Sequence, residues 1–146
     1  MKEAVQKLRE KTGAGVMECK RALEEAGGDL EKAEKMIEVK GIVRAEKKGE
    51  RSTGAGHIET YIHAGRIGIL LEMRCETDFV ARSDQFRSLA HEIAMQVAAM
   101  APETTEELLK QAYIKDPATS ILNLIKKSIA LFGENIKVER FCSYEV

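Results

Sequence analysis

Apolar residues recur every three or four positions through the first forty residues, which is the spacing of short amphipathic helices. Glycines interrupt the pattern at residues 13–15, 27–28 and 41, and Asp29 stands where a third helix would take its N-cap. We therefore expect an N-terminal domain of three helices over residues 1–43. The repeating apolar residues are Val5 and Leu8, then Val16, Cys19, Ala22, Leu23 and Ala26, and then Leu30, Ala33 and Ile37.

The pattern stops between residues 44 and 56, where the chain reads RAEKKGERSTGAG. This stretch has six ionisable side chains, three glycines and no apolar period, which is typical of a solvated linker. A basic recognition patch is the alternative, but glutamates interrupt the lysines. We expect a linker at residues 44–56, followed by a core domain over residues 57–146.

Strand-like alternation begins after the linker. Residues 57–63 and 67–75 alternate apolar and polar side chains around an Ala-Gly-Arg turn, which predicts a β-hairpin. In the second strand Ile69, Leu71, Met73 and Cys75 share one face, the face expected to be buried. Residues 136–146 alternate again and are expected to add a third antiparallel strand.

Three helices are expected between the hairpin and the last strand. Ser83 can cap a long helix that ends before Pro102, and Thr104 with Glu107 forms a capping box for a short one. The dipeptide at residues 116–117, Asp-Pro, suits the start of a final helix that Gly133 would end. The predicted fold class is α+β, with a three-helix domain followed by a three-stranded antiparallel sheet that carries helices on one face.

The charge balance and the hydropathy of the chain argue against two classes of partner, nucleic acids and membranes. The chain of 146 residues has 23 basic and 24 acidic side chains, so it lacks the basic excess with which proteins hold a nucleic-acid backbone. Its apolar stretches are far shorter than the roughly 20 residues of a membrane helix. The N-terminal MKEAVQKLRE has no apolar signal region. We expect a cytoplasmic protein with no direct nucleic-acid or membrane partner.

No pattern in the chain points to covalent chemistry. Cys19, Cys75 and Cys142 are odd in number and widely separated, and no CxxC or HxxxH spacing suggests a metal site. A Gly-rich phosphate loop, a nucleophile elbow and a paired acid and base are also missing. We expect no metal, no cofactor and no enzymatic activity. A thiol or metal enzyme built on Cys75 beside Glu76 is the least supported alternative.

Phe79 is a candidate binding residue, because it lies in a connecting loop and does not belong to the apolar repeat of the following helix. Binding residues tend to occupy such loops on a rigid scaffold. The residue types alone favour a structural interpretation over a binding role: Phe79 would pack into the core and Asp78 would cap a turn.

Three blocks of sequence carry a resemblance to a known family. They are LREKTGAGVMECKRAL at residues 8–23, HAGRIGILLEMRCETDFVAR at residues 63–82, and FGENIKVERF at residues 132–141. Their order and spacing, and the TDFVAR segment above all, resemble translation elongation factor Ts.

The resemblance implies a nucleotide-exchange factor that makes the GTPase elongation factor Tu release GDP. The first domain would have a fold like the ubiquitin-associated domain and dock on the GTP-binding domain of the partner. The TDFVAR segment would enter beside the magnesium and phosphate site, with Asp78 and Phe79 as the disruptive residues. An adaptor that binds a partner only through its N-terminal helices is the alternative function. The residues that the resemblance assigns to partner contact are Arg9, Val16, Met17, Thr77, Asp78, Phe79, Val80, Ala81 and Arg82, with His63 as a weaker candidate.

The sequence departs from the family pattern in length. It has one core repeat, and only residues 103–117 join the long helix to the final one, so an extra helical segment of some single-repeat members is missing. An edge strand over residues 141–146, with Cys142 and Tyr144, would suit a symmetric contact between two copies. We expect a homodimer through the core sheet.

Overall fold

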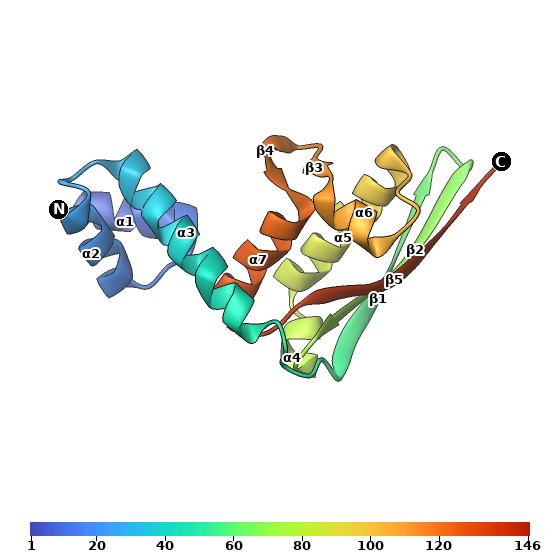
Figure 1. Cartoon of the computed structure of the whole chain (residues 1–146), viewed down its shortest axis with the longest axis horizontal. Coiled ribbons are helices and arrows are strands. Elements are labelled where there is room, and N and C mark those ends of the chain that lie inside the picture. Colours follow the sequence, from blue (N-terminus) through green and yellow to red (C-terminus); the bar gives the residue numbers. More distant parts are fainter.

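Three helices form a bundle at one end of the molecule, and a three-stranded sheet forms the other end in the computed structural model, which describes residues 1–146 (Figure 1). Gly13, at φ 68°, ends α1 in a left-handed conformation that favours glycine. The Asp29 carboxylate caps α3 by accepting from the Lys32 N–H. The bundle consists of α1 (Lys2–Thr12), α2 (Val16–Glu25) and the first half of α3 (Leu30–Lys48).

Helix α3 continues beyond Gly41 to Lys48, so the predicted end of the third helix is wrong. Gly41 is buried because α3 packs against α7 there, and a Cβ at this position would lie 3.2 Å from that of Ala130. Ala45 is also buried, within the larger hydrophobic core of the chain. The first residues of the predicted linker are therefore helical and packed. The division of the chain into two domains stays a prediction, although its buried apolar residues form two separate clusters.

The sheet contains β1 (Ala55–His63), β2 (Ile67–Cys75) and β5 (Lys137–Glu145), antiparallel in the order β1-β2-β5. The predicted hairpin and third strand are confirmed. In the hairpin His63 pairs with Ile67, and Ala55 pairs with Cys75. The predicted inner face of β2 is also buried. The α+β fold class is confirmed.

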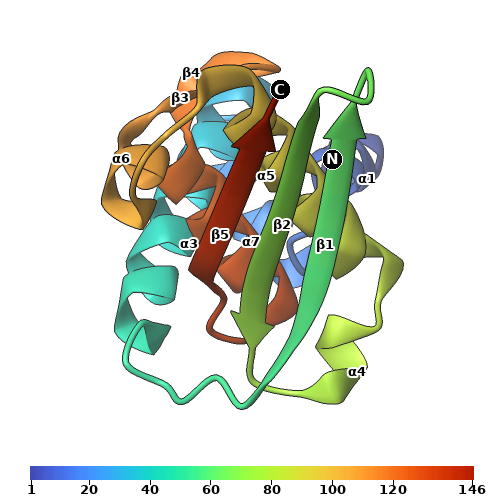
Figure 2. The same ribbon diagram turned by 90° about the vertical axis from the view of Figure 1, so that its right-hand side faces the viewer.

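Helices cover one face of this sheet and leave the other open (Figure 2). Helix α5 (Asp84–Met100) begins at the Ser83 cap, as predicted, and packs on β1 and β2. Helix α7 (Ile121–Phe132) ends at Gly133, also as predicted, and packs on α3. No helix is both long enough and apolar enough to cross a membrane.

The predicted start of the last helix at residues 116–117 is wrong. Those residues belong to β4 (Asp116–Ser120), which pairs with the short β3 (Ala112–Tyr113), and Ser120 caps α7 instead. A buried glutamine fixes this hairpin, since Gln96 of α5 donates to the Ala112 carbonyl and accepts from the Ile114 N–H. Between α5 and β3 lies the predicted short helix, α6 (Thr105–Lys110), with its Thr104 cap.

Candidate partner-binding site

The segment that follows β2 forms one turn of helix, α4 (Asp78–Ala81), where the sequence suggested a loop. Thr77 is its N-cap, and the Thr77 hydroxyl accepts a hydrogen bond from the Val80 N–H at 3.3 Å. At the other end the Ser83 hydroxyl donates to the Val80 carbonyl at 2.7 Å and also caps α5. Both ends of α4 are thus fixed by side chains.

The two halves of α4 point in opposite directions. Successive helical residues are about 100° apart, so the pair of residues 78 and 79 faces away from the pair 80 and 81. Val80 and Ala81 are buried in the core, whereas the Phe79 side chain is 87% exposed and Asp78 is also exposed. The alternative in which Phe79 packs inward is therefore wrong. Of the TDFVAR residues, Thr77, Asp78, Phe79 and Arg82 are exposed, and Val80 and Ala81 anchor the turn in the core.

Cys75 lies beneath this segment and does not behave as a reactive thiol. It is fully buried, and its Sγ donates to the Thr77 carbonyl at 3.2 Å. Burial raises the pKa of the Cys75 thiol, and the negative charges of Glu134 and Asp78 add to the effect. A thiol held protonated is a weak nucleophile, which argues against an enzyme built on Cys75.

The N-terminal candidates lie on the bundle, away from α4. Arg9 of α1 and the pair Val16 and Met17 at the start of α2 are all exposed. Helix α3 spans the distance between the bundle and the α4 end of the core, and its 19 residues rise about 28 Å (Figure 1). The molecule therefore presents two separate exposed surfaces rather than one combined site.

His63 is not brought near Asp78 and Phe79. It lies at the tip of the β1-β2 hairpin, where its Nδ1 is 3.0 Å from the Tyr61 hydroxyl. Segment 76–82 follows the opposite end of β2. The nine residues of β2 are separated by eight steps of about 3.4 Å, which places the two ends of the strand roughly 27 Å apart. His63 and Phe79 cannot reach the same small pocket of a partner.

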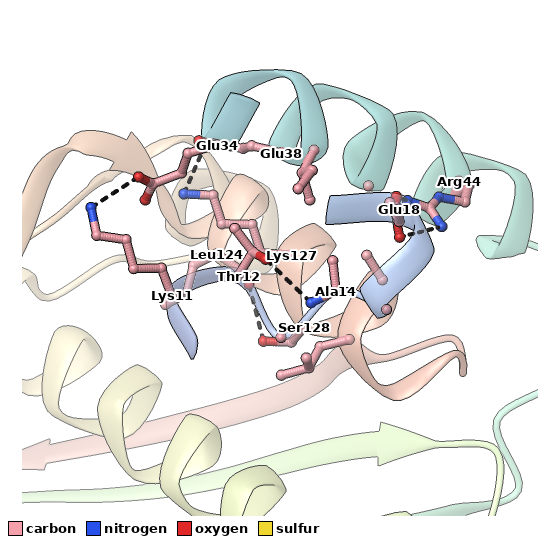
Figure 3. Close-up of a pocket in the computed structure, with 16 residues that line it drawn as sticks. Lys11, Thr12, Ala14, Glu18, Glu34, Glu38, Arg44, Leu124, Lys127 and Ser128 are labelled. Carbon is pink, nitrogen blue, oxygen red and sulfur yellow. Dashed lines mark hydrogen bonds and ion pairs between the residues drawn. The ribbon is translucent and has the colours of Figure 1, made fainter. Parts of the chain in front are cut away.

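A groove of about 470 Å³ lies between the bundle and the core, lined by the α1-α2 connection, α3 and α7 (Figure 3). Its charged side chains are paired with one another across the groove. Lys11 pairs with Glu34, Lys127 with Glu38, and Arg44 with Glu18. These pairs join α1, α2 and α7 to α3, so the charges that line the groove are satisfied within the chain. No group of three or more His, Cys, Asp or Glu side chains is placed to hold a metal ion.

Glu134 and Asn135 were missed as candidate site residues. They lie in the turn between α7 and β5, yet both contact the segment that leads into α4. The Glu134 carboxylate accepts from Glu76 and Thr77, and the backbone N–H of Asn135 donates to the Glu76 carboxylate. The signal that could have found them was present, because both belong to the FGENIKVERF block at residues 132–141.

Comparisons with known proteins agree on one family. The family model described as Elongation factor TS matches residues 76–146. Elongation factor Ts of Coprothermobacter proteolyticus is 43% identical over 183 aligned positions, which cover 94% of this chain and 93% of that protein. The protein of the same name from Thermotoga petrophila is 43% identical over 188 positions, covering 99% of this chain and 94% of that protein. That of Gloeothece citriformis is 42% identical, covering 96% of this chain and 65% of that protein.

The alignments with these relatives are longer than the chain itself. They extend over 183 to 188 positions, whereas this chain has 146 residues. The relatives therefore contain several tens of residues that have no counterpart here.

Proposed function

This chain belongs to the elongation factor Ts family, and on that premise we propose that it is a guanine-nucleotide exchange factor for elongation factor Tu. It would act in the cytoplasm without metal, cofactor or covalent chemistry of its own. The observation that carries the proposal is the outward orientation of Phe79 and Asp78 on an anchored helical turn.

The exposed phenyl ring of Phe79 can provide binding free energy that helps to distort the partner. Burying a ring of this size releases about 2 kcal/mol, which can offset part of the strain of moving the partner's helices. Magnesium in a GTPase requires near-ideal octahedral geometry, so a small displacement of its supporting loops weakens the grip on GDP. Asp78, beside the ring, can accept hydrogen bonds from groups that the displaced magnesium or phosphate leaves behind.

The bundle supplies docking in this proposal. Arg9, Val16 and Met17 are exposed on the bundle and offer a partner one cation and two apolar side chains, residue types that are common in binding surfaces. Docking through this surface would place α4 at the nucleotide site, and the rigid span of α3 would set the distance between the two contacts. His63, at the far end of the sheet, would at most touch a different part of the partner.

Reciprocal linkage gives a test that separates exchange from simple adaptor binding. If the protein weakens GDP binding, GDP must weaken protein binding by the same factor. Mixing the pure protein with elongation factor Tu loaded with fluorescent GDP is expected to speed nucleotide release, and excess GDP is expected to dissociate the complex. Binding that is indifferent to GDP, with no change in release, would favour the adaptor alternative and refute exchange.

A homodimer through the sheet is the second part of the proposal. The open face carries the exposed apolar side chains of Ile58, Ile62, Leu70 and Tyr144, with Cys142 opposite Leu70. Exposed apolar side chains on one face of a sheet are typical of an interaction site. The strand β5 forms one edge of the sheet. If two copies met through their open sheet faces about a two-fold axis, the same residues of each copy would be buried.

A further inference from the structure

The carboxylate of Glu134 receives three hydrogen bonds from the chain just before α4. Its Oε1 accepts from the N–H groups of Glu76 at 3.1 Å and Thr77 at 3.0 Å, and its Oε2 accepts from the Thr77 hydroxyl at 2.7 Å. Glu134 is 57 residues away from Thr77 in the sequence. The start of α4 is therefore held by a distant segment of the chain, through a charged acceptor that makes strong hydrogen bonds.

Asn135 extends this contact to the end of α3. It is 4% exposed, its N–H donates to the Glu76 carboxylate at 2.6 Å, and its side-chain amide donates to the carbonyls of Gly49 at 3.2 Å and Arg51 at 2.9 Å. The Arg51 guanidinium lies 3.7 Å from the same Glu76 carboxylate. In Figure 2 the α3-β1 connection, the end of β2 and the start of β5 lie at the same, lower end of the sheet.

Helix α4 depends on such support because a single helical turn has little stability of its own. Its four residues supply only Val80 and Ala81 to the core. If the Thr77 end came loose, the turn could fray, and the Phe79 ring could fold back on the protein's own apolar surface. When the Thr77 end of α4 is held, the rotation of the turn keeps the Phe79 ring facing outward.

From these contacts we propose that Glu134 and Asn135 are positioning residues for exchange. Glu134 holds α4 so that Phe79 and Asp78 are presented to the partner, and Asn135 ties that arrangement to the end of α3. The inference rests on the proposed exchange function, and neither residue needs to touch the partner.

Four substitutions in the full-length protein test this role. Glu134→Ala removes all three acceptor contacts, whereas Glu134→Gln keeps one oxygen for the two N–H groups and an amide for the Thr77 hydroxyl. Asn135→Asp keeps the shape but loses both amide donors to the Gly49 and Arg51 carbonyls. Glu139→Ala is the matched control, because Glu139 lies on β5, just after the turn that holds Glu134 and Asn135, and pairs only with Lys137. Circular dichroism would establish that each variant folds.

Two readouts separate positioning from docking. Amide hydrogen exchange in the free protein is expected to be about tenfold faster at Glu76 and Thr77 in Glu134→Ala, since hydrogen bonds to a charged group are lost. The maximal rate of GDP release from elongation factor Tu should fall about tenfold, because loosening of α4 displaces the ring for part of the time and a full ångström of misplacement can cost about 100-fold. The concentration for half-maximal release should stay within about twofold, since docking through the bundle is intact.

Glu134→Gln should recover most of both effects, and Asn135→Asp should also loosen the Glu76 amide and slow release. Unchanged amide exchange in Glu134→Ala and Asn135→Asp would overturn the inference, and so would faster amide exchange with an unchanged maximal rate. If the wild-type protein released no GDP, the exchange proposal and the positioning role would both fall. In that case the amide measurement would still show whether the contact holds α4. The two failures are thus distinguishable.

Discussion

At the scale of single residues, Phe79 is the side chain that departs most from ordinary burial. A phenylalanine left 87% in water forgoes about 2 kcal/mol of burial energy that its neighbours Val80 and Ala81 obtain. It is held there because α4 has a fixed rotation, set by the Thr77 cap and the two anchors below. Folding does not need this ring, so its reason for being there must be sought in binding.

Replacing Phe79 should leave stability almost unchanged. We expect Phe79→Ala to alter the free energy of unfolding by less than about 0.5 kcal/mol, as for exposed positions in general. The adjacent Val80→Ala should cost about 2 kcal/mol, because Val80 fills the core. Urea unfolding of both variants measures the difference. A loss in Phe79→Ala as large as that in Val80→Ala would show that the ring packs on its own domain in solution.

The orientation of Phe79 could not be predicted from residue type and period. The sequence showed that residues 77–82 break the helical period, but a one-residue change in the phase of so short a helix decides whether Phe79 or Val80 faces the core. That phase depends on Glu134, which is distant in sequence and reaches Thr77 only in the folded chain. Residue types alone favoured an inward Phe79, and only the resemblance to a family pointed the other way.

At the scale of elements, the packing of α3 on α7 joins the bundle to the core. Gly41 lets the two helices approach closely, and ion pairs from Lys126 to Glu46 at 2.9 Å and from Lys127 to Glu38 at 2.8 Å flank the contact. The sequence showed Gly41 as a helix end because glycine commonly ends helices. Close packing against α7, about 80 residues later in the chain, leaves no local signal. The end of α3 at Lys48 therefore could not be predicted from the sequence.

Enlarging Gly41 should weaken the contact between α3 and α7. Gly41→Leu is expected to destabilise the protein by about 1 to 3 kcal/mol, because extra methylene groups at a tight helix contact force the helices apart. Lys47→Leu, on an exposed position of the same helix, is the control for the effect of leucine itself. Urea unfolding should show the loss only for Gly41→Leu. Equal stability of the two variants would mean that the helices do not approach so closely.

The β3-β4 hairpin is held on α5 by Glu92, and this contact should show a dependence on pH. Burial alone would raise the pKa of Glu92, but hydrogen bonds from Lys115 at 2.6 Å and Tyr113 at 2.8 Å outweigh it and lower the pKa below 4.5. Burial and the Glu92 carboxylate raise the pKa of Tyr113 to about 12. The hairpin could not be predicted, because Asp116 and Pro117 match a helix start and its real supports, Glu92 and Gln96, lie on another element.

A carboxylate whose pKa is lowered by folding stabilises the protein above its unfolded pKa, and this stabilisation is lost as pH falls through the folded pKa. The stability of the wild-type protein should therefore decrease below pH 4.5 more steeply than that of Glu92→Gln, which has no carboxylate to protonate. Urea unfolding at a series of acidic pH values measures the two slopes. Parallel slopes would contradict the charged contact.

At the scale of the whole molecule, the helical bundle, the turn α4 and the open sheet face lie at separate places on one elongated body (Figure 1). The element order and the sheet topology could be predicted, because alternation and helical periodicity are local properties of the chain. The separation of His63 from Phe79 also follows from strand length once the hairpin is known. Association of the open sheet face with a second copy depends on the assembled sheet and leaves no local signal in the chain.

The sheet-mediated dimer predicts a mass in solution of twice the 16.2 kDa of one chain. Leu70→Lys should reduce the mass to that of a monomer, because it places a charge at the centre of the apolar face. Val39→Lys, on an exposed position of α3, should leave the dimer intact. Light scattering at micromolar concentration measures all three proteins. A wild-type mass near 16 kDa would reject the dimer.

If the outward ring of Phe79 drives nucleotide release, stopped-flow release of fluorescent GDP from elongation factor Tu should depend on it. At saturating concentration the wild-type protein should speed release strongly. Phe79→Ala should lose about 30-fold of that rate, the equivalent of about 2 kcal/mol of ring burial. A Phe79→Ala protein that releases GDP as fast as the wild type, or a wild-type protein that leaves the release rate unchanged, would contradict the account.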